Sequence, residues 1–276
     1  MSRGPLLALT ILAATMPDVS AAADLLMPPP PELRPTLPAE IGSGWYLRGD
    51  VGITNQRVDR LSNSLDALGT IEKVDLGFAS SPFVGVGAGY RVNDWLRADV
   101  TGEYRSKASF LGLERYRDAA LPGGYGTDEY TATKREAVFL ANAYVDLGTY
   151  YGFTPFVGAG VGTAYNTIEH FKDVNTVTRA VAYASPGSKW NLAWALHAGV
   201  AYDILPNLKL EFGYRYLNLG DAQTGKIYTY DGQCAFPGCD NLKFKSVDSH
   251  DIKIGLRWAL GASAAEAEVP PLVRRY

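Results

Sequence analysis

The chain has 276 residues, of which 47% are hydrophobic and 12% aromatic, and it contains 29 glycines and 17 tyrosines. The formal net charge is only −3, so the composition offers no basic excess for binding nucleic acid. Abundant tyrosine and glycine favour a β protein with aromatic belts and close backbone packing over a helical enzyme.

The first 23 residues have the parts of a secretory signal peptide. Arg3 supplies a positive charge, residues 6–14 form a short apolar stretch, and small residues around Ala21 offer a cleavage site. The apolar stretch is too short for a membrane helix, which needs about 20 residues. Residues 24–43 are rich in proline and are expected to form a periplasmic N-terminal tail rather than a packed core.

The residues that follow alternate strictly between apolar and polar side chains. In residues 45–54, Trp45 and Leu47 share one face, whereas Arg48 and Asp50 share the other. A period of two indicates a β-strand, and about 10 residues is the length that crosses a bilayer at a tilt. The same pattern returns in seven further segments, at residues 83–92, 95–106, 137–147, 155–165, 191–204, 208–218 and 249–260.

Short and long connections alternate between these segments. The links at 93–94, 148–154 and 205–207 are short, whereas the other four are long and polar, at residues 55–82, 107–136, 167–190 and 219–248. Short periplasmic turns and long extracellular loops are typical of outer-membrane barrels. We therefore predict an all-β fold: an eight-stranded antiparallel transmembrane β-barrel over residues 44–260 in the cell outer membrane, followed by a C-terminal periplasmic tail at 261–276.

Aromatic residues gather near the predicted strand ends. Aromatic rings prefer the level of the lipid headgroups in a membrane protein, whereas the core of a soluble β-sandwich, the alternative fold, would place them in mid-strand. The aromatic residues expected at the periplasmic membrane interface are Trp45, Tyr90, Trp95, Tyr202 and Trp258.

Several of these elements resemble a known family. They are the signal peptide, the proline-rich mature start, GWYLRGDVG at residues 44–52 and DIKIGLRW at residues 251–258. Together they are similar to the small eight-stranded surface-antigen barrels of alphaproteobacterial outer membranes, within the OmpA-like and opacity-like group. The resemblance implies an abundant, often immunogenic surface protein that contributes to envelope integrity, is sometimes described as a porin, and has no cofactor. One departure is that members usually end on an aromatic residue of the last strand, whereas 16 residues follow Leu260 here.

Charged residues of both signs fall on the predicted inner face of the barrel. An eight-stranded barrel is only wide enough inside for side chains, and an unpaired buried charge is costly. We therefore expect a salt-bridged plug, and the alternative is a narrow ion pathway that opens when the pairs rearrange. The residues expected in this network are Arg48, Asp50, Arg97, Asp99, Glu103, Arg105, Glu211, Arg215, Lys253 and Arg257, with Asp146, Lys209 and Asp251 on the same face.

The sequence contains no convincing catalytic constellation. His250 adjoins Ser249, but neighbouring residues of a strand point to opposite faces, which disfavours a lipid-facing hydrolase triad. The GxGxG runs at 85–89 and 158–162 lie in mid-strand, so they are not dinucleotide sites. Their glycines instead give bulky neighbours room inside a small lumen. We predict no enzyme activity, no catalytic or metal-binding residue and no cofactor.

The two cysteines, Cys234 and Cys239, lie in the sequence CAFPGC. In an oxidising compartment this spacing predicts a disulfide, and the alternatives are two free thiols or half of a metal site. The predicted loops also carry tyrosines that suit adhesion or antigenicity, or that pack on each other: Tyr116, Tyr125, Tyr130, Tyr183, Tyr228 and Tyr230.

The predicted function is a structural role in envelope integrity combined with surface interaction. The alternatives are a small porin or ion channel and, less favoured, a membrane-embedded lipid-modifying enzyme. The expected partners are outer-membrane lipid and lipopolysaccharide, the barrel-assembly machinery, and an extracellular ligand that the loops bind.

Overall fold

The computed structural model describes residues 44–62, 71–235 and 239–260 of the chain. Within these ranges it contains eleven strands and one short 3-10 turn, η2 (Pro122–Gly124). No helix in these ranges is long and apolar enough to cross a membrane. The signal peptide and proline-rich tail expected at residues 1–43, and the tail expected at 261–276, lie outside the described residues.

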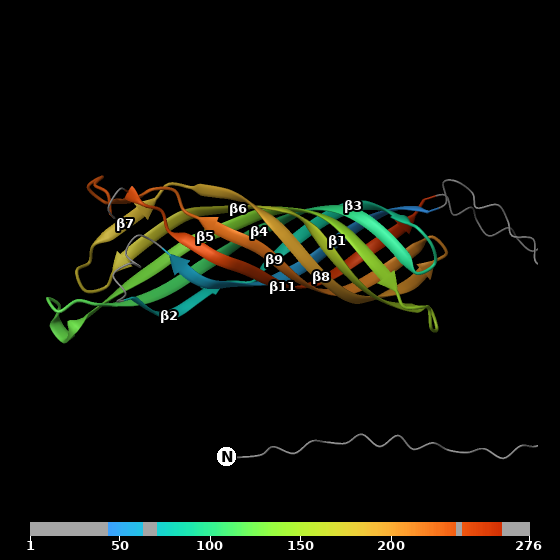
Figure 1. Cartoon of the computed structure of the whole chain (residues 1–276), viewed down its shortest axis with the longest axis horizontal. Coiled ribbons are helices and arrows are strands. Elements are labelled where there is room, and N and C mark those ends of the chain that lie inside the picture. The colour runs from blue at the N-terminus through green and yellow to red at the C-terminus, as the bar shows by residue number, and fades with distance from the viewer. Residues whose placement is uncertain (1–43, 63–70, 236–238, 261–276) are drawn as a thin grey trace, which may run out of the picture. The chain divides into compact units, whose positions relative to one another are not determined.

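Eight strands close into an antiparallel ring, which confirms the expected fold class (Figure 1). The first and last strands of the ring, β1 and β11, pair with each other, and β1 also pairs with β3. β6 pairs directly with β8, which completes the ring. The ring strands are β1 (Trp45–Ser62), β3 (Ser81–Arg91), β4 (Leu96–Arg117), β5 (Tyr125–Asp146), β6 (Phe153–Asn175), β8 (Gly187–Leu205), β9 (Leu208–Gln223) and β11 (Lys243–Ala259).

The two ends of the barrel differ. At the turn end, short links join β3 to β4, β5 to β6 and β8 to β9. The opposite end, the loop end, carries the longer links and three short strands: β2 (Ile71–Phe78), β7 (Val181–Ala184) and β10 (Ile227–Thr229) (Figure 1). β2 pairs with β4 beyond the end of β3, while β7 pairs with β6, and β10 pairs with β7.

Apolar side chains cover the outside of the ring. In β1, Leu47 and Ile53 point outward and are 45% and 61% exposed, whereas Arg48 and Asp50 point inward and are buried. Because successive side chains of a strand lie on opposite faces, the alternation in the sequence produces this arrangement, which suits a hydrocarbon environment. We call the exposed outward residues the apolar belt, which includes Leu47, Val51, Ile53, Val84, Val86, Val100, Phe139, Val157, Val161, Leu192, Leu196, Phe212, Ile252, Ile254 and Leu256.

The ring strands extend further at the loop end than the sequence predicts. Residues 107–117 of β4 and 125–136 of β5 are strand, although the sequence placed them in a long loop. Here outward side chains such as Lys107 are polar and inward ones such as Phe110 are apolar, which reverses the pattern of the membrane-crossing segments. Because the stretch is also rich in polar residues, its alternation was not recognised as a strand. We call the part beyond the apolar belt the loop-end extension: residues 55–62, 106–117, 125–136, 166–175, 217–223 and 243–249.

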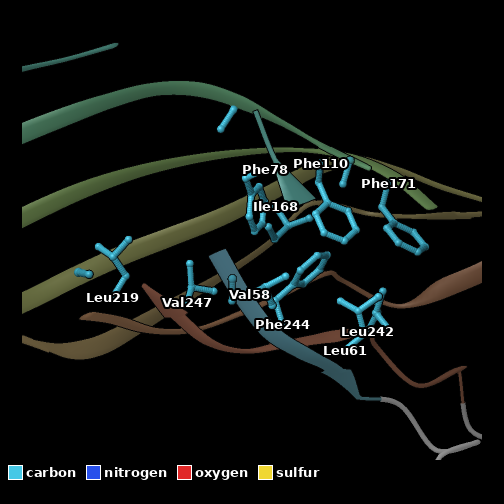
Figure 2. Close-up of a cluster of buried hydrophobic side chains, with 14 of the residues drawn as sticks. Val58, Leu61, Phe78, Phe110, Ile168, Phe171, Leu219, Leu242, Phe244 and Val247 are labelled. Carbon is cyan, nitrogen blue, oxygen red and sulfur yellow. The ribbon is translucent and has the colours of Figure 1, made fainter. Parts of the chain in front are cut away.

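An apolar core fills the inside of the loop-end extension (Figure 2). Figure 2 shows Phe78, Phe110 and Phe244 converging from β2, β4 and β11. The ring centroids of Phe78 and Phe110 lie 5.0 Å apart, and those of Phe110 and Phe244 lie 4.9 Å apart. Burying one such side chain contributes about 1.5–3 kcal/mol, so this core stabilises the part of the barrel that projects beyond the apolar belt.

Candidate functional site

A network of charged side chains occupies the lumen from the turn end to the level of the apolar core. The structure places all ten residues of the expected charge network on the inner face of the ring, each at most 6% exposed. Four further charged side chains join them: Lys134, Glu136, Asp146 and Asp251. The network thus has seven basic and seven acidic side chains, so the lumen is formally neutral at this level.

Arg48 of β1 joins three strands across the turn-end half. Its Nη1 donates to Asp99 of β4 at 2.7 Å, and its Nη2 donates to Asp50 at 2.9 Å and to Glu211 of β9 at 3.2 Å. The guanidinium group has five donors in a fixed plane, which suits an arginine surrounded by several carboxylates. One side chain therefore satisfies acids from three strands.

Arg215 and Arg105 form a second set of pairs closer to the loop end. Arg215 of β9 donates from both Nη atoms to the carboxylate of Glu103 on β4, at 2.5 and 2.7 Å. Arg105 of β4 binds Asp251 of β11 in the same two-pronged manner, at 2.7 and 2.8 Å. Both guanidinium groups also lie 5.3 Å from the centre of the Phe83 ring. These pairs span the lumen and hold β4, β9 and β11 together.

Aromatic rings complete the network at the turn end. The Nε of Arg97 donates to Asp146 at 3.1 Å, and its guanidinium group lies 4.0 Å from the centre of the Tyr144 ring. Arg257 lies 3.0 Å from Glu211 and 5.5 Å from the centre of the Tyr46 ring. A cation over an aromatic face is stabilised by the ring's electrostatic field, so these rings supplement the carboxylates.

The sequence prediction missed Lys134 and Glu136, because both lie in a stretch that it assigned to a loop. The Nζ of Lys134 donates to the side chain of Gln56 at 3.0 Å and contacts Glu136, which lies 2.6 Å from the Nε of Arg105. Their inward orientation could have been predicted by continuing the alternation of β5 towards the loop end, since even-numbered residues of this strand such as Asn142 point inward.

Glycines on the inner face provide space for these bulky groups, as the sequence predicts. A Cβ atom on Gly87 would lie 2.9 Å from the Thr101 side chain and 3.1 Å from the Cγ of Arg48. A Cβ atom on Gly158 would lie 2.5 Å from the Tyr144 ring. The absence of a side chain at these two positions therefore makes room for Arg48 and Tyr144.

The histidines and Ser249 are not arranged as a hydrolase site. Ser249 points inward and donates to Asp251 at 2.5 Å, whereas His250 points outward and its Nδ1 lies 2.6 Å from the Tyr214 hydroxyl. His197 points inward, with its Nε2 3.1 Å from the Oδ1 of Asn142. Across the described ranges, no group of three or more His, Cys, Asp or Glu side chains is placed to hold a metal ion.

An acidic cluster lies inside the loop-end extension. The hydroxyl of Tyr130 donates to Glu114 at 3.1 Å, and the Asn175 amide donates to Asp128 at 2.9 Å. Burial, together with the nearby carboxylates of Asp128 and Glu114, raises the pKa of Asp173 from 3.8 to about 8. Asp173 is therefore largely protonated at neutral pH.

The pKa of a second acid in the loop-end extension is shifted in the opposite direction. Partial burial raises the pKa of Asp221, but hydrogen bonds from Lys245, the Ser246 backbone amide and Lys189 outweigh this effect and lower its pKa to about 2. Lys245 Nζ lies 2.8 Å and Lys189 Nζ 3.1 Å from the carboxylate. This charged cluster faces outward beyond the apolar belt.

The loop end also carries a disulfide and several exposed tyrosines. Cys234 and Cys239 form the predicted disulfide in the link between β10 and β11, with their Cα atoms 4.6 Å apart. Five of the six tyrosines expected in loops lie on strands instead, and Tyr130 is buried there at 4% exposure. Tyr230, which lies in a turn, is 87% exposed.

The five aromatic residues expected at the membrane interface all lie close to the turn end. Trp45 begins β1 and Trp258 is the penultimate residue of β11, while Trp95 directly precedes β4. The rings of Trp45 and Tyr90 lie 5.4 Å apart, and Tyr202 pairs with Phe153 at 4.7 Å. All five point outward and are 39–54% exposed, which is the position that an interfacial ring requires.

Comparisons with known proteins agree with this architecture. The family model described as "Outer membrane protein beta-barrel domain" matches residues 6–261. An uncharacterized protein of Brucella suis is 31% identical over 94% of this chain and 99% of its own length. A protein of Rickettsia prowazekii that bears the name "putative adhesin" is 26% identical over 80% of this chain and 89% of its own.

Similarity to solved structures is also found. Neisserial surface protein A is 20% identical, with a TM-score of 0.41, over 79% of this chain and 98% of its own. The outer membrane protein OprG from Pseudomonas aeruginosa is 15% identical, with a TM-score of 0.44, over the same shares of the two chains.

Proposed function

The chain belongs to the family of outer membrane proteins that have a β-barrel domain, and we propose that it acts there as a closed surface barrel. In this role the rigid scaffold supports the envelope, and the loop end binds an extracellular partner. Lipid and lipopolysaccharide surround the apolar belt under this proposal, the barrel-assembly machinery inserts the chain, and the barrel neither conducts solutes nor catalyses a reaction.

The observation that carries the closed lumen is the pairing of Arg215 with Glu103 across the ring, while Asp251 of the neighbouring strand β11 also binds Arg215. A conducting path would have to separate these groups, and breaking a buried ion pair costs about 3–5 kcal/mol. The apolar core around Phe110 lies above the network and adds a second barrier, because a charged solute would lose its hydration there. The two layers together favour a sealed interior.

The surface role rests on the loop-end extension. Most of its outward side chains are polar, although Leu111 is an exception, so this part of the barrel is suited to water beyond the membrane. Beside it at the loop end, Tyr183, Tyr228 and Tyr230 are exposed, at 44%, 38% and 87%, and exposed tyrosines are common in surfaces that bind other proteins. The adhesin name of the Rickettsia relatives supports the same role.

A small ion channel is the second candidate, and the charged lumen is the observation that favours it. Seven basic and seven acidic side chains line the path from the turn end, and such a lining could carry ions if the pairs rearranged. The apolar core at the loop end opposes this function, because an ion that passed its buried side chains would lose hydration.

Conductance of the purified protein in a planar bilayer separates these two candidates. The closed-barrel proposal expects the current to stay at the bilayer's baseline at every voltage that the bilayer withstands. A steady, reproducible conductance of the wild-type protein would contradict the proposal and favour the channel.

Adhesion of bacteria that display the chain tests the surface role. Replacing Tyr183 and Tyr230 by serine should reduce binding to cultured host cells or extracellular matrix. The matched control replaces Tyr150 and Tyr151 at the turn end, which are more exposed, at 65% and 101%, and should leave binding unchanged. Equal binding by the wild-type chain, both variants and bacteria that lack the chain would remove the support for this role.

A further inference from the structure

A groove of about 720 Å³ lies on the outside of the barrel, where β1, β3 and β11 are neighbours. Six short apolar side chains line it: Val51, Ile53, Pro82, Val84, Ile252 and Ile254. They form two rows across the three strands, because Pro82 pairs with Ile53 and Ile53 with Ile252, while Val84 pairs with Val51 and Val51 with Ile254. The pairing register of the three strands therefore brings the six side chains of the groove together.

Larger aromatic side chains border the Val84 row on both sides and the Pro82 row on the β9 side. Val84 pairs with Tyr104 of β4, Ile254 pairs with Phe212 of β9, and Ile252 pairs with Tyr214 of β9. All three aromatic residues point outward and are 46–53% exposed. Since paired residues lie on the same face of a sheet, the short side chains form the floor of the groove and the aromatic rings flank it on the neighbouring strands.

The groove becomes polar at its loop-end side. Asn55 of β1 pairs with His250 of β11, and both line the groove there. His250 is held between the Tyr214 hydroxyl, 2.6 Å from its Nδ1, and Asp248, 3.7 Å from its Nε2. In the next outward row, Arg57 pairs with Asp248. The apolar groove thus leads to two polar rows, Asn55 with His250 and then Arg57 with Asp248.

β3 begins at this side of the groove. Its first residue, Ser81, pairs with Thr54, so Asn55 has no partner on β3. The outward face of β1 changes from apolar to polar at the same level, between Ile53 and Asn55. This change marks the level of the lipid headgroups at the loop end, so a lipid in the groove would place its headgroup beside His250 and Arg57.

We propose that this groove binds one acyl chain of lipopolysaccharide, the glycolipid of the outer leaflet, with a phosphate of its headgroup beside Arg57 and His250. The apolar floor faces the hydrocarbon of the bilayer, and the exposed aromatic rings beside it confine a linear chain. Phosphate is well matched by an arginine guanidinium group at the polar end. The inference rests on the chain's membership of the outer membrane family and is independent of the proposed surface role.

Native mass spectrometry of the refolded full-length chain tests the proposal. Purified lipopolysaccharide is added to the protein in detergent, and the number of retained molecules is counted. We expect the wild-type chain to retain one molecule and the Ile252→Trp variant, which fills the groove, to retain it about tenfold less, because buried methylene groups supply the affinity. The matched control is Leu192→Trp on β8, where the side chain is 71% exposed compared with 70% for Ile252, and it should behave as the wild type.

Two further arms identify the ligand. The Arg57→Ala variant should lose affinity for phosphorylated lipopolysaccharide but should bind dephosphorylated lipopolysaccharide as the wild type does. Phosphatidylethanolamine should be retained more weakly than lipopolysaccharide by the wild-type chain. Equal retention by the Ile252→Trp and Leu192→Trp variants, or retention of phosphatidylethanolamine at the same level as lipopolysaccharide, would overturn the proposal, provided that the gel mobility of both variants shifts on boiling as a folded barrel's does.

Discussion

The guanidinium group of Arg215 and the carboxylate of Glu103 face each other across the lumen and share two hydrogen bonds, of 2.5 and 2.7 Å. Arg215 lies on β9 and Glu103 on β4, and the two strands are not neighbours in the ring. The pair is therefore a strut between opposite walls rather than a contact within one sheet edge.

Replacing Glu103 by alanine should lower the free energy of unfolding by about 3–5 kcal/mol, because it leaves Arg215 buried with an incomplete set of partners. Urea unfolding in lipid vesicles, followed by tryptophan fluorescence, measures the change. The control is Glu72→Ala, which removes an exposed pair with Arg115 at 3.8 Å and should change the free energy by less than about 1 kcal/mol. Similar effects of the two substitutions would show that the strut adds nothing to stability.

The apolar core of the loop-end extension provides a second test of the sealed interior. Phe110→Ala should destabilise the barrel by about 3–5 kcal/mol through the cavity that it leaves. Conductance in a planar bilayer should stay at baseline, because the charge network beneath the core still closes the lumen. Leu111→Ala is the control, since its side chain points outward on the same strand and is 66% exposed. A steady current through the Phe110→Ala variant alone would mean that the core is the only seal.

Stability should fall as the pH rises from about 4 to about 8, because the pKa of Asp173 is about 8 in the folded barrel and 3.8 in the unfolded chain. The folded state binds the proton more tightly in this window, so raising the pH favours unfolding. Asp173→Asn removes the titrating group and should make the urea midpoint at pH 8 more similar to that at pH 5. Asp231→Asn, at a fully exposed position, should keep the wild-type slope, and an unchanged slope in Asp173→Asn would contradict the assignment.

Reduction of the disulfide between Cys234 and Cys239 should loosen the loop end without opening the barrel. The bridge closes a short loop between β10 and β11, for which chain entropy predicts about 2 kcal/mol of stabilisation. Limited proteolysis under reducing conditions should therefore cut near residues 231–242 while the ring strands resist. Cys234→Ser should reproduce this cleavage without reductant, whereas an equal cleavage rate in oxidised wild-type protein would refute the stabilising role.

Much of the ring could be predicted from the sequence, because the outward residues of the apolar belt, such as Val51 and Leu192, alternate with polar inward ones over the length of a membrane crossing. The loop-end extension escaped prediction because its polarity is inverted, as Lys107 and Phe110 illustrate. β7 and β10 have only four and three residues, too few for any periodicity to be visible.

The sequence was enough to predict most of the residues that belong to the charge network, but not which of them pair with each other. Alternation placed Arg48 and Glu211 on the inner face, yet nothing in the sequence shows that they are 3.2 Å apart. Pairing across a lumen depends on the closure of the ring and on the stagger of its strands. The groove on the outside of the barrel could not be predicted for the same reason, since its floor combines Pro82, Ile53 and Ile252 from three strands.

The cross-lumen pairs have a consequence for how the barrel assembles. Arg48 is 163 residues from Glu211, Arg215 is 112 from Glu103, and Arg105 is 146 from Asp251, so none of these bonds can form locally. Contacts between such distant residues make folding slow, and these bonds are completed only when the last strands arrive. A slip of one residue in the β1–β11 pairing would turn the side chains of one strand to the wrong face and expose Arg48 or Asp251 to hydrocarbon. The lumen charges thus favour closure of the ring only in the register that keeps these charged side chains inside.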